Sequence, residues 1–188
     1  LCKTLLAAQA EIHLDRCEHR AGAKNDGRRK NDRSRASTVT KRNLNMHEDI
    51  LNIQQLLARF ANSFYVKDWD GLQACFTESL YTDYSDLRGT PPETISASEY
   101  VRLRRESLDH LKLHHVVGNY EVTFPDFDAA ACRASMVVWR RSETEEFTTH
   151  CMYDFQLARQ WGAWKISGIT QKVLWSEGVS SIHKGAKA

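Results

Sequence analysis

Apolar side chains recur at helical spacing at the start of the chain's most ordered-looking region. They fall three or four positions apart, which places them on one face of an amphipathic helix: Ile50, Ile53, Leu57, Phe60 and Phe64. Asn45 and Glu48 precede them with the spacing of a capping box. The pattern therefore predicts a first helix from about residue 45 to residue 67.

Two shorter helices and a strand are predicted to follow. Asp68 can cap a second helix, whose Leu72 and Phe76 face inward, and Trp69 is expected to pack as a wedge between the two helices. Residues 80–85 have the composition of a short strand. The segment 96–99, Ser-Ala-Ser-Glu, is a second capping box and opens a helix that runs to about residue 110.

Four long strands complete the pattern, over about 112–124, 130–141, 146–159 and 163–175. The links between them are short and either polar or glycine-bearing, which is typical of an antiparallel meander. Three helices followed by four strands predict an α+β fold with the helices on one face of the sheet.

Strand alternation predicts which side chains share a face. On the side of a possible pocket it places His115, Val117, Asn119, Val137, Trp139, Arg141, Phe147, Thr149, Cys151, Tyr153 and Phe155. The opposite face keeps Val116, Val122, Met136, Val138 and Met152, with Trp175 at its edge. Because the helices cover only one face, these apolar side chains predict a homodimer through the other face.

Charge divides the chain unevenly. Residues 1–45 hold 11 of the 26 Lys and Arg but 5 of the 24 Asp and Glu, so their net charge is +6, whereas residues 46–188 carry −4. This pattern predicts a basic, disordered extension over 1–45 with Met46 as the native start, a folded domain over 46–178 and a flexible tail over 179–188. Nucleic-acid binding would rest on the basic extension alone and is not expected.

Several classes of site and location lack a sequence signal. No apolar run approaches the roughly 18 residues of a membrane-spanning helix, so no membrane association is expected. The five cysteines are odd in number and form no C-x-x-C pair, which favours a reducing, cytoplasmic environment. Metal-ligand spacing, phosphate-binding glycine loops and nucleophile elbows are also absent from the sequence, and no metal is expected.

One stretch, residues 60–84, resembles the corresponding segment of the scytalone dehydratases, which belong to the SnoaL-like group of the nuclear-transport-factor-2-like superfamily. The resemblance spans roughly residues 48–177 and rests on Lys67-Asp68-Trp69-Asp70-x-Leu72, Cys75 and Asp83-Tyr84. It implies a cone-shaped α+β fold, in which three N-terminal helices pack on a curved, mostly antiparallel sheet and enclose a pocket. It also implies proton transfer without a metal or other cofactor.

Carried over by position, the resemblance implies specific roles. It places the catalytic histidine at His115 and a carbonyl-polarising tyrosine at Tyr84. The family's Tyr-Asp pair on the first helix is Phe64-Tyr65 here, so Tyr65 is the candidate to hydrogen-bond His115 in place of the missing carboxylate. The family's second histidine aligns with Arg141, whose guanidinium could bind an anionic or enolic oxygen. The other candidate ligand-binding residues are Phe60, Phe64, Trp139, Cys151 and Tyr153.

Two functions remain open at this point. One is a cofactor-independent lyase or isomerase, dehydratase-like, which moves a proton through His115 on a small hydrophobic carbonyl or hydroxy compound. The other is a non-catalytic small-ligand-binding or dimeric interaction domain that has lost the family Asp. His115 and Tyr84 favour the first function, and Tyr65 in place of the carboxylate favours the second.

Overall fold

The computed structural model describes residues 26–184, and the side chains of residues 46–184. Residues 1–42 and 43–188 form two compact units; only part of one helix is described in the first, and all other elements belong to the second. No helix in the described part of the chain is long and apolar enough to cross a membrane. The elements are α1 (Asp26–Val66), α2 (Trp69–Gln73), β1 (Phe76–Asp83), α3 (Ser85–Arg88), β2 (Glu93–Ser96), α4 (Ala97–Leu108), β3 (Lys112–Asp126), β4 (Ala129–Arg141), β5 (Glu146–Gln160), β6 (Ala163–Gly178) and the 3-10 helix η1 (Ser180–Ile182).

Helix α1 starts earlier than its apolar pattern predicts. Asn45 does not cap it, because the helix already begins at Asp26. Residues 28–44 contain neither proline nor glycine, so no strong helix breaker separates them from the amphipathic part. Residues 26–45 of the predicted disordered extension are therefore helical, and residues 1–25 lie outside the described residues.

The corner after α1 is fixed by three consecutive side chains. Lys67 takes a left-handed backbone conformation (φ 60°), and its Nζ donates to the carbonyl oxygens of Leu108 (2.9 Å) and Leu111 (2.8 Å). Asp68 accepts a hydrogen bond from the Gly71 amide and caps α2, as predicted. Trp69 packs edge-on against Phe64 and donates to Asp109. The Lys-Asp-Trp motif therefore ties the end of α4 to the α1–α2 corner.

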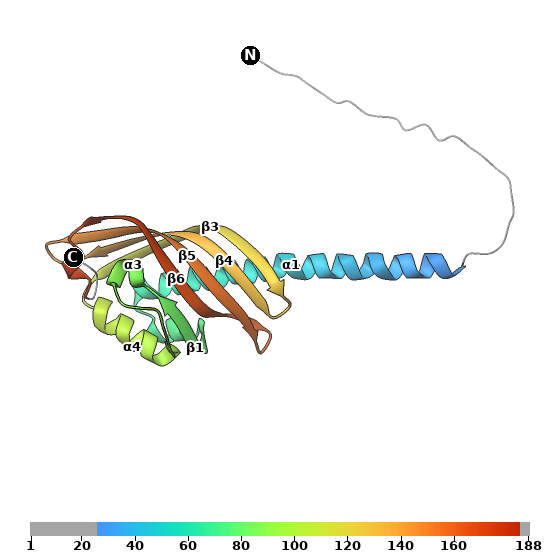
Figure 1. Cartoon of the computed structure of the whole chain (residues 1–188), viewed down its shortest axis with the longest axis horizontal. Coiled ribbons are helices and arrows are strands. Elements are labelled where there is room, and N and C mark those ends of the chain that lie inside the picture. Colours follow the sequence, from blue (N-terminus) through green and yellow to red (C-terminus); the bar gives the residue numbers. More distant parts are fainter. Residues whose placement is uncertain (1–25, 185–188) are drawn as a thin grey trace, which may run out of the picture. The chain divides into compact units, whose positions relative to one another are not determined.

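The sheet has six strands in the order β2-β1-β6-β5-β4-β3. Strand β1 runs parallel to β6, and all other neighbours are antiparallel. The four long strands curve side by side (Figure 1). The predicted α+β class, the four long strands and the Ser96-capped helix are confirmed, while the short elements α3 and β2 were not predicted.

An irregularity in β3 exchanges its two faces. Asn119 has a positive φ of 54°, and the pairing with β4 shifts between Gly118 and Glu121. Asn and Gly tolerate such a conformation better than most residues. Before the shift His115 points inward. After it, Val122 packs against the core while Asn119 is exposed, so both lie opposite to the predicted faces.

The predicted inner face of β4 is wrong. His115 pairs with Val138, and directly paired residues of neighbouring strands point to the same side of a sheet. The inward side chains of β4 are therefore the even-numbered ones: Cys132, Ala134, Met136, Val138 and Arg140. Trp139 and Arg141 lie on the outer face. Met136 and Val138, which were predicted to lie on the dimer surface, are buried in the core.

The helices and the inner face of the sheet share one apolar core. Ile53, Leu57 and Phe60 of α1 are almost completely buried in it. At the other end of this packed region, the Asp49 carboxylate accepts hydrogen bonds from Arg159 (2.7 Å) and from the Trp164 indole (2.9 Å). These contacts fix α1 against the β5–β6 hairpin and so position its inward residues over the sheet.

Candidate active site

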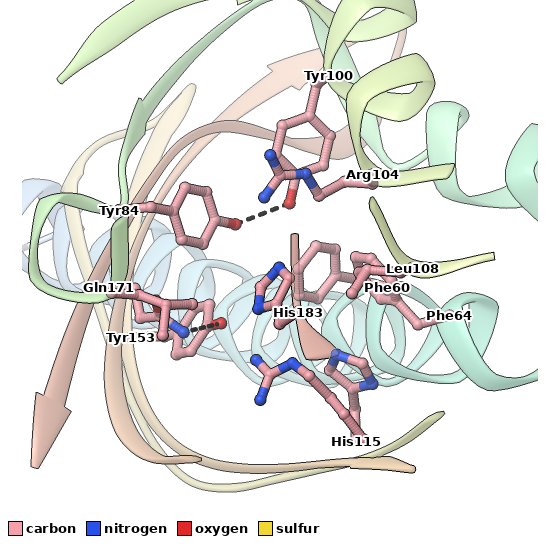
Figure 2. A pocket seen from close by; sticks show the side chains of 12 residues that line it. Phe60, Phe64, Tyr84, Tyr100, Arg104, Leu108, His115, Tyr153, Gln171 and His183 are labelled. Atoms are coloured by element: carbon pink, nitrogen blue, oxygen red, sulfur yellow. Dashed lines mark hydrogen bonds between the residues drawn. The ribbon is translucent and has the colours of Figure 1, made fainter. Parts of the chain in front are cut away.

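A small cavity of about 30 Å³ lies between the inner face of the sheet and helices α1 and α4. A cavity that binds a benzene-sized ring is several times larger, about 150 Å³. Apolar, hydroxyl and cationic side chains surround it (Figure 2): Phe60, Phe64, Tyr84, Leu87, Tyr100, Arg104, Leu108, His115, Arg140, Tyr153, Gln171 and His183. None of these lining side chains is a carboxylate.

His115 enters the cavity from β3. Its ring is stacked on Phe64, with centroids 4.6 Å apart and the planes inclined by 20°. Nδ1 is buried without a hydrogen-bond partner. Burial lowers the pKa of His115 to about 3, assisted by the positive charge of Arg140. The imidazole is therefore neutral near pH 7 and able to accept a proton.

Two tyrosines form a hydroxyl pair on the opposite wall. Tyr84, at the end of β1, and Tyr100 of α4 share a hydrogen bond of 2.7 Å. Since one hydroxyl must donate to the other, one proton of the pair remains free for another acceptor. Burial raises the pKa of both phenols, so they stay protonated donors.

A third hydroxyl belongs to Tyr153 on β5. The Gln171 side-chain amide donates to its oxygen at 2.7 Å, which leaves the Tyr153 O–H free to donate. Burial raises the pKa of Tyr153 well above its usual value. Cys151 does not line the cavity; its sulfur lies near the same Gln171 amide, at 3.5 Å, and burial raises the pKa of its thiol.

Two arginines of the cavity wall are buried. Arg140 Nη1 donates to Thr149 (3.1 Å) and to the Val138 carbonyl (3.4 Å), while its Nε has no partner. Arg104 Nε is also buried without a partner. Burial lowers the pKa of Arg140 to about 10, and the nearby charge of Arg104 contributes to this.

The C-terminal segment supplies a second histidine. His183 follows η1, in a segment that the sequence pattern assigned to a flexible tail, and its side chain is 3% exposed. Figure 2 shows its ring between the Tyr84–Tyr100 pair and His115. Neither ring nitrogen has a hydrogen-bond partner, and burial lowers the pKa of His183 to about 2.

The structure brings together five of the sequence-predicted site residues and separates the rest from them. The five that line the cavity are Phe60, Phe64, Tyr84, His115 and Tyr153. Tyr65 is exposed on α1, where it packs edge-on against His114 instead of reaching His115. Trp139 stacks on His114 on the outer face, and Arg141 pairs with Glu146 there.

Some of the residues that were not predicted do carry a sequence signal. Arg104 lies four positions from both Tyr100 and Leu108, so it falls on the buried stripe of α4 instead of the solvated side. Arg140 continues the apolar alternation of Met136 and Val138. Gln171 continues the alternation of Ile169 on β6 and pairs with the inward-facing Tyr153. His183 follows no such pattern, because its placement depends on the path of the chain after β6.

The chemistry available in this cavity is that of acid, base and hydrogen-bond donors. Residues 46–184 contain no group of three His, Cys, Asp or Glu side chains placed to hold a metal ion. A neutral imidazole can accept a proton, and nearby hydroxyl and guanidinium groups can stabilise an oxygen that becomes negative. The arrangement suits abstraction of a proton next to a carbonyl group.

Sequence relatives and solved structures match about seven tenths of the chain. A scytalone dehydratase-like protein (claB) of Passalora fulva is 26% identical in an alignment of length 145, which covers 70% of this chain and 88% of that protein. A scytalone dehydratase of Colletotrichum orbiculare is 24% identical in an alignment of length 149, which covers 69% of this chain and 76% of that protein. The crystal structure of the Kfla4162 protein from Kribbella flavida superimposes with a TM-score of 0.69 at 22% identity, over 73% of this chain and 97% of that one. Residues 45–170 match the SnoaL-like domain, and the chain belongs to this family.

Proposed function

We propose that this protein is a cofactor-independent lyase of the dehydratase type, which acts on a small cyclic hydroxy-ketone. The observation that carries the proposal is a buried, neutral His115 facing the same cavity as three tyrosine hydroxyls. Relatives that are named scytalone dehydratase or scytalone dehydratase-like support the same reaction class.

In the proposed reaction, His115 removes a proton from the carbon next to the substrate carbonyl. The C–H electron pair moves into the new carbon–carbon double bond of an enolate, and the carbonyl oxygen becomes negative. A tyrosine hydroxyl stabilises this oxygen; Tyr84 or Tyr100, and Tyr153, each offer a suitable proton. The β-hydroxyl group then leaves with the proton held by His115, so that water and an unsaturated ketone are the products.

The α1 side chain that packs against His115 is the ring of Phe64, whereas Tyr65, which aligns with the family's carboxylate, lies against His114. Because burial and the charge of Arg140 lower its pKa and none of the side chains that line the cavity is a carboxylate, His115 is a weak base. This feature also favours the second candidate function, a small-ligand-binding protein without catalysis. The two candidates differ in whether His115 exchanges a proton with the bound ligand.

The cavity volume of about 30 Å³ requires a lining side chain to move before a ring can enter. His183 is the most readily displaced, because its ring forms no hydrogen bond and it lies beyond the last strand. Its backbone amide bonds only to Ser180 within the same short segment. In the proposed cycle, this segment withdraws to admit the substrate.

Dehydration of 3-hydroxy-1-tetralone tests the proposal, because loss of water and tautomerisation give the fluorescent product 1-naphthol. We expect wild-type protein to accelerate its appearance, and His115→Gln to lower the rate by about 100-fold or more, the usual contribution of a general base. His114→Gln is the matched control, since His114 lies on the outer face of the same strand. No acceleration by wild type, or equal rates in wild type and His115→Gln, would reject this function.

A further inference from the structure

We propose that the cavity binds its ligand through a carboxylate group, held by Arg104 and Arg140, so that the substrate is a small cyclic hydroxy-ketone with an aromatic ring that also carries a carboxylate. This inference deepens the proposed function, on which it rests, by naming the class of substrate. The ring of the ligand would lie against the apolar wall formed by Phe60, Phe64 and Leu108.

The first observation is an uncompensated positive charge. Arg104 and Arg140 are 5% and 4% exposed, and neither belongs to any ion pair among residues 46–184. Arg88, next to them behind Tyr84, is likewise without an acidic partner in the described residues and has a pKa lowered to about 10 by burial. Buried arginines are normally paired with an anion. The missing negative charge is therefore expected from the ligand.

The second observation is the set of unused donors. Two guanidinium N–H sites of the cavity wall are buried without an acceptor, Nε of Arg104 and Nε of Arg140. Arg88, which lines a neighbouring pocket, has two more, Nε and Nη2. Buried donors without acceptors are destabilising, so a ligand that supplies acceptors gains affinity. The planar fork of an arginine matches the two oxygens of a carboxylate, which is why we infer this group instead of a neutral carbonyl.

The aromatic wall favours a ligand with a flat ring. Phe60 and Phe64 pack edge to face with their ring centroids 5.3 Å apart, and Phe64 in turn stacks on the His115 ring. On the other side, Arg104 Cζ lies 5.3 Å from the Tyr84 ring and 5.2 Å from the Tyr100 ring. These contacts hold the guanidinium at the edge of the apolar wall, where a ring substituent would reach it.

The charge of such a ligand would also act on His115. The titratable and charged groups whose charge acts on this imidazole are Arg140, Lys67, His183 and, from the outer face, His114, and none of them is acidic. A carboxylate in the cavity would offset the charge of Arg140 and raise the basicity of His115. The substrate would thus strengthen the base that acts on it.

Fluorescence titration with 2-naphthoate and with its neutral isostere 2-naphthamide tests this inference on the full chain. We expect naphthoate to bind at least about 10-fold more tightly than naphthamide. Arg140→Gln and Arg104→Gln should each weaken naphthoate binding by about 10-fold or more, as for loss of a hydrogen bond to a charged group. Arg141→Gln is the control, because Arg141 is the neighbouring arginine on the outer face, where it pairs with Glu146. The Arg141→Gln protein should bind naphthoate with the affinity of wild type.

Equal affinity for naphthoate and naphthamide, or no binding of naphthoate by the folded protein, would overturn the inference. So would an Arg141→Gln protein that loses as much affinity as Arg140→Gln. If the Gln variants fail to fold, NMR titration of wild-type His115 decides instead: naphthoate should raise its pKa, and an unchanged pKa in the saturated protein contradicts carboxylate binding here. Naphthoate binding without any turnover of 3-hydroxy-1-tetralone would reject the lyase function and retain the carboxylate site. Turnover of 3-hydroxy-1-tetralone without naphthoate binding would retain the lyase function and reject the carboxylate site.

Discussion

Phe64 lies almost parallel to His115, with ring centroids 4.6 Å apart, so the α1 side chain that packs against the imidazole is an aromatic ring. The adjacent Tyr65, which was the candidate replacement, points away to His114 and is 40% exposed. The environment of the proposed base is therefore aromatic and apolar. Burial in this environment, together with the charge of Arg140, lowers the pKa of His115, and Phe64 is the α1 residue in direct contact with the ring.

Phe64→Asp should raise the pKa of His115, because a carboxylate next to an imidazole stabilises the protonated form. NMR titration of the His115 ring protons measures this change. Tyr65→Asp is the control, since its side chain projects from the outer side of α1 and should leave the pKa nearly unchanged. A larger shift in Tyr65→Asp than in Phe64→Asp would show that the assigned helix face is incorrect.

The two cavity histidines should make the protein sensitive to mild acid. Their folded-state pKa values, about 3 for His115 and about 2 for His183, lie below the ordinary value of 6.5. Between these limits the unfolded chain binds protons that the folded chain does not, so the free energy of unfolding should fall as the pH is lowered below about 6.5. Denaturant titrations at pH 7, 6, 5 and 4 measure this dependence.

Replacement of His115 by phenylalanine removes one of these protonation sites. The pH dependence of stability between pH 7 and 4 should therefore be shallower in His115→Phe than in wild type. His114→Gln, on the exposed face of the same strand, should retain the wild-type dependence. Identical slopes for wild type and His115→Phe would show that His115 is not buried as a neutral ring.

Most of the fold was predictable because its signals are local. The helical spacing of Ile53, Leu57 and Phe60, the cap at Ser96 and the short links between strands each act over a few residues. The start of α1 was not predictable from the apolar pattern, because its upstream part has none. The faces of β3 beyond Gly118 depend on a change of register that alternation alone does not contain.

The site was predictable only in part, for a related reason. His115, Tyr84 and Tyr153 could be placed from the family resemblance and from strand alternation. Position-by-position alignment assigned the pocket arginine to Arg141, whereas the arginine that faces inward is its neighbour Arg140. Because side chains of a strand alternate between the two faces of the sheet, an error of one residue moves a side chain to the opposite face. His183 reaches the cavity through the path of the chain after β6, which no periodicity describes.

The outer face of the sheet leads us to propose a homodimer. Val116, Val137, His150 and Trp175 are successive partners across β3, β4, β5 and β6, and the Trp175 ring stacks on His150 at 4.2 Å. Val116 and Trp175 are 47% and 52% exposed, so this row offers apolar surface to a second copy. Analytical ultracentrifugation at micromolar concentration should show a dimer.

Trp175→Arg should convert that dimer to a monomer, because it places a charge in the apolar row. Trp161→Arg is the control, since Trp161 is fully exposed in the β5–β6 turn and should leave the dimer intact. A wild-type protein that sediments as a monomer would exclude this interface, as would a Trp175→Arg protein that remains dimeric.

Proton abstraction by His115 is most directly tested by deuterium exchange into 1-tetralone, a ketone that has no hydroxyl group to lose. In D2O, wild-type protein should accelerate exchange of the protons on the carbon next to the carbonyl, followed by NMR of the ketone. His115→Gln should lower the catalysed rate by about 100-fold or more, while His114→Gln should keep the wild-type rate. Equal exchange rates in wild type and in a folded His115→Gln protein would contradict the assignment of His115 as the base.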